Sequence, residues 1–262
     1  MVATVLTFAG LDPSGGAGLQ ADIETIAELG GTALPIMTAN TIQNTQSFLE
    51  SHATDPDWLK HQTQHLLKDI TPNAIKIGLL SSTTTVDAIH ESLIDEQLKD
   101  LPVVLDPVLR SGSGADLSND DLILAIKEKL LPLTTIITPN NHEARKLTGC
   151  DSMDEAATIL IETGCRFVLI TGADEAEAQV ENRLYGQNGL IEVYNFEKLP
   201  DTYHGSGCTL SSAIAVLLAK GLNHRSAVEQ AQAYAWETLK AGHQIGQGQK
   251  HPTRIRNNYR SY

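Results

Sequence analysis

Residues 4–29 read TVLTFAGLDPSGGAGLQADIETIAEL, and this stretch decides the fold class. It begins with the apolar, partly β-branched run Thr4 to Ala9, which predicts a buried strand. A glycine-rich loop follows, and residues 19–29 then carry apolar side chains at helical spacing until Gly30 and Gly31 end the pattern. A strand, a loop and a helix in this order predict a crossover to a second, parallel strand.

The same alternation continues down the chain. Further short apolar runs predict strands at residues 74–77, 102–105, 135–138 and 167–171. Helical patterns occupy residues 86–93 and 122–131, and Ser152 with Glu155 forms the capping-box pattern of another helix start. We therefore predict a three-layer α/β/α domain with a mostly parallel central sheet and a ligand pocket at the carboxyl ends of the strands.

One segment departs from this alternation. Residues 180–185 and 190–196 flank Gly186-Gln187-Asn188-Gly189, which predicts a small antiparallel hairpin at the edge of the sheet. Because no repeat, low-complexity segment or long linker interrupts residues 1–246, we expect them to form one domain. From Gln247 to Tyr262 the chain is polar and lacks apolar periodicity, so we expect a peripheral tail there.

The composition excludes several classes of protein. The 262 residues include 19 basic and 32 acidic side chains, a net charge of −13, which argues against a nucleic-acid-binding protein. The first ten residues lack the pattern of a signal peptide or membrane span, so we expect a cytoplasmic location. The three cysteines are an odd number and show no CxxC spacing, so we expect reduced thiols and no structural zinc site.

The segment His204-Gly205-Ser206-Gly207-Cys208-Thr209 precedes an apolar run that predicts a buried helix. Glycines allow a ligand to approach the backbone, and the N–H groups of a first helical turn bind anions. Cys208 falls in that turn, where the helix dipole is expected to lower the pKa of a thiol. The competing interpretations are a glycine turn that only leads into a buried helix, and an inert buried thiol.

Two other segments carry candidate polar groups. The loop from Ala9 to Asp22 is glycine-rich but lacks both the P-loop lysine and the dinucleotide fingerprint, so a small-molecule pocket fits it better. Asp22 then either binds substrate or complements the helix dipole. Asp106 ends one predicted strand and Glu143 starts a helix after another, a pair suited either to hydrated Mg²⁺ or to capping and turn formation.

Taken together, these segments resemble the ribokinase-like superfamily and, within it, the hydroxymethylpyrimidine/phosphomethylpyrimidine kinases of thiamine biosynthesis. The resemblance runs from about Thr4 to Gly242. The motifs that carry it are Ala9 to Asp22, Gln43-Asn44-Thr45, Lys76-Ile77-Gly78, Leu105 to Val108, Thr138-Pro139-Asn140 with Glu143, and His204 to Thr209. Cysteine at position 208, where most sugar kinases of the superfamily have aspartate, points to the pyrimidine kinases.

The resemblance implies a ribokinase-like fold, a homodimer, and transfer of phosphate from ATP, with Mg²⁺, to 4-amino-5-hydroxymethyl-2-methylpyrimidine and then to its monophosphate. It implies that Cys208 is catalytic beside an anion hole that includes Gly205 and Gly207. The implied substrate contacts are Gly10, Ala17, Asp22, Gln43, Leu79 and Val108. The implied nucleotide and phosphate contacts are Asp106, Asn140, Thr171 and Ser206, with Glu143 and Asp106 at the metal and Arg110 as a loop cation.

Two alternatives stay open from the sequence. A pyridoxal kinase of the cysteine-bearing type takes a heteroaromatic alcohol of similar shape. A non-catalytic pyrimidine-binding regulatory protein would keep the pocket and lack phosphate transfer.

Overall fold

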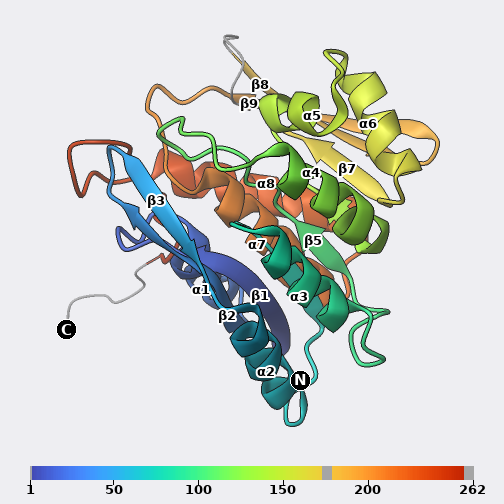
Figure 1. Cartoon of the computed structure of the whole chain (residues 1–262). Coiled ribbons are helices and arrows are strands. Elements are labelled where there is room, and N and C mark those ends of the chain that lie inside the picture. The colour runs from blue at the N-terminus through green and yellow to red at the C-terminus, as the bar shows by residue number, and fades with distance from the viewer. Residues whose placement is uncertain (1, 173–178, 257–262) are drawn as a thin grey trace.

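The computed structural model describes residues 2–172 and 179–256, and their centre is a single sheet (Figure 1). Across these residues the sheet has nine strands in the order β3-β2-β1-β4-β5-β6-β7-β8-β9. The strands are β1 (Ala3–Leu11), β2 (Gly31–Gln43), β3 (Phe48–Ala53), β4 (Ala74–Ile77), β5 (Val103–Leu105), β6 (Ile136–Ile137), β7 (Phe167–Ile170), β8 (Gln179–Gly186) and β9 (Gly189–Glu197).

The centre of the sheet is parallel and both of its edges are antiparallel. Strands β2, β1, β4, β5, β6 and β7 pair in parallel. All of them except β2 were predicted as strands from the sequence. The predicted edge hairpin is also present, as β8 and β9 with Gly186 opposite Gly189. The opposite edge carries a second antiparallel pair, β2 with β3, that the sequence analysis did not predict.

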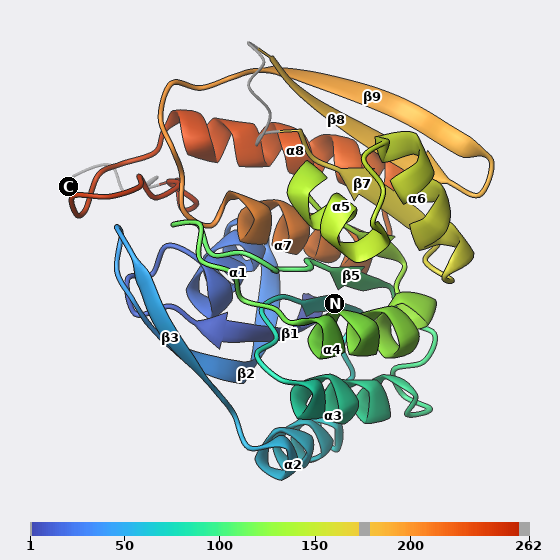
Figure 2. The ribbon, with the colours of Figure 1, turned by 45° about the horizontal axis from the view of Figure 1, so that its top comes forward.

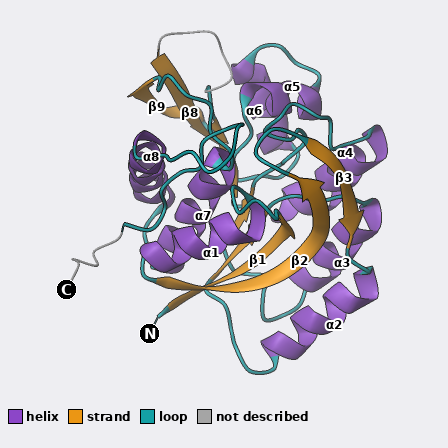
Figure 3. Cartoon of the chain, turned by 90° about the vertical axis from the view of Figure 1, so that its left-hand side faces the viewer, coloured by secondary structure: helices purple, strands orange, loops and turns teal. Residues whose placement is uncertain are grey.

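Helices cover both faces of the sheet and make the predicted three layers (Figure 3). The helices are α1 (Gly18–Glu28), α2 (Pro56–Leu67), α3 (Thr83–Leu93), α4 (Asp120–Ala125), α5 (Asn141–Thr148), α6 (Met153–Glu162), α7 (Ser206–Ala219) and α8 (His224–Lys240). Helix α4 continues into a π-helical segment, Ile126–Leu130, and a 3-10 turn, Leu131–Leu133. Helices α1, α7 and α8 share one core, and α2 to α6 pack on the other (Figure 2).

Alternation along the central strands explains why they form two cores. Val5 packs with α7 and α8, whereas Leu6 and Phe8 pack into the opposite core. Ile136 and Ile137 divide in the same way. A parallel strand buried on both faces has apolar side chains at successive positions, and this is the pattern that made these strands visible in the sequence.

The segment from residue 247 to residue 256, here named the C-terminal strap, differs from the predicted peripheral tail. His251 and Arg254 are only 4% and 2% exposed. The backbone N–H of Gln249 donates to the Thr45 carbonyl at 2.9 Å, and that of Thr253 donates to the Thr238 carbonyl at 2.9 Å. The polar strap can be buried because its polar groups form hydrogen bonds to other segments. The polarity of its sequence therefore did not indicate exposure. Residues 257–262 of the predicted tail lie outside the described residues.

None of the helices in residues 2–172 and 179–256 is both long enough and apolar enough to cross a lipid bilayer.

Candidate active site

A cavity of about 800 Å³ opens at the carboxyl ends of the parallel strands. This is the edge at which open α/β sheets place ligands, because successive loops converge there. All but one of the residues assigned to the site by resemblance line it: Gly10, Ala17, Gln43, Leu79, Asp106, Val108, Asn140, Glu143, Thr171, Gly205, Ser206, Gly207 and Cys208. The exception is Asp22. Arg110 also lines the cavity, and its Nε donates to the Gly114 carbonyl at 2.8 Å.

The glycine turn before α7 is tightly packed against the loop after β1. Gly205 caps α7 with a φ of 81°, in the left-handed region that favours glycine. A Cβ at Gly205 would lie 1.9 Å from the carbonyl oxygen of Gly16, so no side chain fits there. The first N–H groups of a helix have no partner within the helix. Since this turn lines the cavity, it is suited to bind a phosphoryl group.

Cys208 lies in that turn with its side chain almost entirely buried. Burial raises the pKa of its thiol to about 12; the Lys76 ammonium acts in the opposite direction, and the Asp106 and Asp22 carboxylates add to the increase. The expectation that the helix dipole would lower this pKa is therefore wrong, because loss of hydration outweighs the dipole. At neutral pH Cys208 is a neutral thiol.

Asp22 lies behind the cavity wall. Its Oδ1 accepts hydrogen bonds from Lys76 Nζ at 2.8 Å and from Ser212 Oγ at 2.7 Å, and it has no exposed surface. Position 22 is buried because α1 turns this face toward α7 and the sheet. Asp22 thus serves as the counter-ion of a buried lysine and does not itself line the cavity.

Asp106 directly follows β5, lines the cavity and is 4% exposed. Burial raises the pKa of this carboxyl, although the Lys76 ammonium and a hydrogen bond with Cys208 favour its charged form. Ser211 Oγ donates to Asp106 Oδ2 at 3.2 Å. One buried lysine therefore acts electrostatically on both the carboxylate and the thiol of the wall.

Glu143 has a structural role in addition to its place at the cavity. Asn140 and Glu143 form a capping box on α5, with Glu143 N donating to Asn140 Oδ1 at 2.8 Å and Asn140 N donating to Glu143 Oε2 at 3.0 Å. The backbone N–H of Leu109 donates to Glu143 Oε1 at 3.3 Å. These bonds fix the carboxylate in one orientation on the cavity wall.

The donor set at this end of the cavity fits hydrated Mg²⁺. The described residues contain no group of three or more His, Cys, Asp or Glu side chains placed to hold a metal. Magnesium does not need such a group, because it keeps several waters and takes one or two carboxylates together with phosphate oxygens. Glu143, in the first turn of α5, and Asp106, directly after β5, both line the cavity and would supply those carboxylates.

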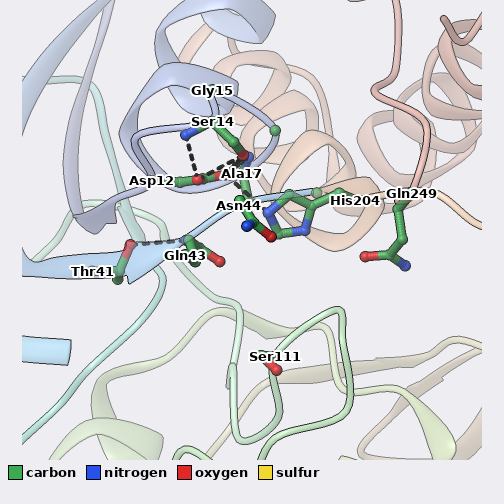
Figure 4. A network of polar contacts seen from close by, with 12 residues as sticks. Asp12, Ser14, Gly15, Ala17, Thr41, Gln43, Asn44, Ser111, His204 and Gln249 are labelled. Carbon is green, nitrogen blue, oxygen red and sulfur yellow. Dashed lines mark hydrogen bonds and ion pairs between the residues drawn. The ribbon is translucent and has the colours of Figure 1, made fainter. Parts of the chain in front are cut away.

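A polar network around Asp12, missed in the sequence analysis, holds the loop after β1 (Figure 4). Its carboxylate accepts hydrogen bonds from Ser14 N at 2.8 Å and Ala17 N at 2.9 Å, and His204 Nε2 lies 2.9 Å from Oδ2. Burial alone would raise the pKa of Asp12, but the bonds from His204 and Ser14 lower it to about 2. The signal in the sequence was Asp-Pro-Ser-Gly, a turn in which an aspartate bonds the following backbone.

Part of the cavity lining consists of aromatic side chains and a side-chain amide. Phe196, Trp236 and Gln232 line it from β9 and α8. Trp236 Nε1 donates to the Glu197 carbonyl at 3.0 Å, and Gln232 Oε1 accepts from Asn182 Nδ2 at 2.8 Å. No motif marks these residues, since their grouping depends on how α8 crosses the edge hairpin.

Comparison with known proteins assigns this architecture to a family. Residues 12–253 match the family described as phosphomethylpyrimidine kinase. The hydroxymethylpyrimidine/phosphomethylpyrimidine kinase of Escherichia coli K12 is 33% identical over 92% of this chain and 94% of its own length. The thiamine biosynthesis bifunctional protein ThiED of Geobacter sulfurreducens is 35% identical over 94% of this chain, which spans 51% of that longer protein.

A solved structure adds the three-dimensional likeness. The pyridoxal kinase of Bacillus subtilis, solved as an ADP complex, superposes with a TM-score of 0.87 at 30% identity, covering 97% of this chain and 98% of that one. The match therefore extends over the whole fold and includes the cavity edge of the sheet. On these grounds the chain belongs to the phosphomethylpyrimidine kinase family, whose fold is ribokinase-like.

Proposed function

We propose that this protein transfers phosphate from ATP to 4-amino-5-hydroxymethyl-2-methylpyrimidine, and then to the resulting monophosphate, in thiamine biosynthesis. The observation that carries the proposal is the turn from Gly205 to Gly207, which places the first N–H groups of α7 at the cavity next to Cys208. The family and the named relatives support the pyrimidine as substrate.

The turn acts on the phosphoryl group in transfer. Fixed N–H donors at a helix N-terminus stabilise the charge on its oxygens, and this accounts for most of the catalysis in reactions of this type. We place the pyrimidine beside Gly10, Gln43, Leu79 and Val108, which line the same cavity as the turn, with its hydroxymethyl group toward the turn. There Gln43 Nε2 also donates to Thr41 Oγ1 at 2.9 Å, which holds the amide side chain in place (Figure 4).

Cys208 orients the acceptor oxygen. Because its pKa lies near 12, it holds its proton at neutral pH and hydrogen-bonds as a thiol. Phosphoryl transfer through a loose transition state depends on positioning more than on a strong base, so a neutral thiol suffices. Glu143 and Asp106 would hold Mg²⁺, which when bound would neutralise part of the phosphate charge.

A second substrate is favoured by one observation. The superposed Bacillus subtilis protein is named as a pyridoxal kinase, and it matches nearly the full length of this chain. A cavity of about 800 Å³ has room for either heteroaromatic alcohol beside a nucleotide. The curated relatives named after the pyrimidine favour the first substrate, and we place pyridoxal second.

The test is a parallel assay. Purified protein is incubated with ATP and Mg²⁺ and with hydroxymethylpyrimidine, its monophosphate or pyridoxal, and the products are resolved by mass spectrometry with Cys208→Ala as the control. Formation of the pyrimidine diphosphate by the wild type supports the proposal. Phosphorylation of pyridoxal alone moves the function to the second substrate, and ligand binding without any product supports the non-catalytic alternative.

We further propose that the protein works as a cytoplasmic homodimer. The location is supported by three free cysteines, and the assembly by large apolar side chains exposed on β2 and β3, Ile42 and Leu49. Size-exclusion chromatography with light scattering distinguishes the dimer from a monomer.

A further inference from the structure

Arg254 is the only arginine among the described residues whose side chain is fully buried, and it comes from the C-terminal strap. We propose that Arg254 is a positioning residue of the phosphate-binding turn, a role that rests on the kinase function proposed above. No motif of the sequence includes it, and it does not line the cavity.

The guanidinium of Arg254 joins two backbone segments of the site. Its Nε donates to Thr209 Oγ1 at 2.8 Å, on the first turns of α7. Its two terminal nitrogens donate to carbonyl oxygens of the loop after β1, one to Gly15 at 3.5 Å and the other to Gly16. The planar guanidinium group can donate to acceptors on both segments at once, whereas the ammonium group of a lysine could not reach all of them.

The two segments that Arg254 joins, the loop after β1 and the start of α7, pack so closely that no side chain fits between them at Gly205. The Gly16 carbonyl that accepts from Arg254 is the atom that a Cβ at Gly205 would meet at 1.9 Å. The same Cβ would lie 2.8 Å from the arginine nitrogen. Thr209 Oγ1 in turn donates to the Gly205 carbonyl at 2.8 Å. Arg254 therefore fixes the separation between Gly16 and Gly205, and with it the direction of the N–H groups of the turn.

The positive charge of Arg254, like its hydrogen bonds, favours the binding of an anion at the turn. Among the described residues its carboxylate partner is Glu24, at 3.2 Å, whose side chain is 25% exposed and therefore reached by solvent. A buried cation behind the first turn of a helix adds to the positive end of the helix dipole. Both effects make an anion at the cavity face of the turn more stable.

The experiment compares Arg254→Met, Arg254→Ala, Arg254→Lys and the control Arg256→Met with the wild type in the phosphorylation assay described above. Arg256 is exposed and only two positions away. We expect Arg254→Met to lower kcat at least tenfold while KM for the pyrimidine changes less than threefold, because the pyrimidine end of the cavity is untouched. Arg254→Lys keeps the charge and loses the fork, so at least a fivefold loss of kcat remains. Guanidinium ion at millimolar concentration restores part of the kcat of Arg254→Ala, and sodium ion at equal ionic strength does not.

The binding of ADP separates this inference from the proposed function. If the wild type forms no product, the kinase proposal fails, and calorimetry then still tests Arg254: Arg254→Met should weaken ADP binding at least fivefold and leave the binding of pyrimidine within twofold. A folded Arg254→Met protein with kcat and ADP affinity within twofold of wild type overturns the inference. If that variant does not fold, the inference is tested by comparing Thr209→Val with Thr209→Ser. Only the valine variant lacks the hydroxyl that accepts from Arg254 Nε. Equal kcat values in these two variants also overturn the inference.

Discussion

The ammonium group of Lys76 lies 2.8 Å from Oδ1 of Asp22, and neither side chain has any exposed surface. The lysine also acts on Cys208 and Asp106, and the ion pair keeps its pKa above the ordinary value despite complete burial. A single buried cation thus balances the acidic groups behind and along the cavity wall.

Replacing Lys76 by methionine should destabilise the fold strongly. The change removes the cation and leaves Asp22 charged and buried, a loss of about 3–5 kcal/mol in the free energy of unfolding. Urea denaturation followed by circular dichroism measures it. The matched control is Lys60→Met, which breaks an exposed pair with Asp57 and Glu91 and should change stability little. Equal effects of the two changes would contradict a structural ion pair at Lys76.

The raised pKa of Cys208 predicts a slow thiol. At pH 8 its thiolate fraction should be about 1000-fold lower than that of an ordinary cysteine, because its pKa is about 12 and not 9.0. Alkylation by iodoacetamide, mapped by mass spectrometry, should therefore be slow at Cys208 in the folded protein and rapid in urea. Because the folded pKa is above the unfolded value, the stability due to the neutral thiol is complete below about pH 9 and declines as the pH approaches 12. Equal alkylation rates with and without urea would disprove this environment.

Alanine at Gly205 should impair catalysis more than alanine at Gly221. Both glycines have a left-handed φ, 81° and 86°, but only Gly205 faces a backbone atom, whereas nothing lies within 4 Å of a Cβ at Gly221. Gly221→Ala should cost about 1–2 kcal/mol of stability with kcat unchanged. Gly205→Ala should add a displacement of the anion-binding turn and lower kcat about 100-fold. Thermal unfolding of both variants measures the backbone strain that they share. Steady-state kinetics measures the additional effect of the contact between a Cβ at position 205 and the Gly16 carbonyl.

Glutamine at position 143 should change the dependence on magnesium. Glu143→Gln keeps one oxygen that can accept from the Asn140 N–H, so α5 stays capped. The change replaces the oxygen that accepts from the Leu109 N–H by an NH2 group, and it removes a negative charge from the cavity wall. We expect the Mg²⁺ concentration at half-maximal rate to rise at least tenfold, with pyrimidine binding unchanged. The control is Glu155→Gln, on the first turn of α6 and outside the cavity. An unaltered Mg²⁺ titration in Glu143→Gln would place the metal elsewhere.

The parallel strands could be predicted because burial on both faces gives them unbroken apolar runs, as at residues 103–105. Strand β2 escaped because its burial alternates and Pro35 and Asn40 interrupt its apolar positions. Strand β3 escaped because most of its side chains remain partly or fully exposed. A strand that depends on its neighbour for half of its burial leaves a weak signal in the sequence.

Motifs in the local sequence identified most of the residues that line the cavity, but they did not predict the burial, charge and partners of those residues. Cys208 was found from its glycine motif, yet its pKa depends on burial and on Lys76, which lies far away in the chain. Asp22 was assigned to substrate by resemblance, and its position in the first helix gave no sign of its lysine partner, 54 residues away. Both depend on contacts between distant segments, and these become visible only in the folded chain.

The position of Arg254 in the chain also sets the order in which the site can be completed during synthesis. Residue 254 follows every helix and strand of the described structure. A chain made only to the end of α8 already contains every strand of the sheet and both cores, but its loop after β1 and the start of α7 lack their shared guanidinium. A chain that stops before residue 254 is therefore expected to form its sheet and cores without a fixed phosphate-binding turn.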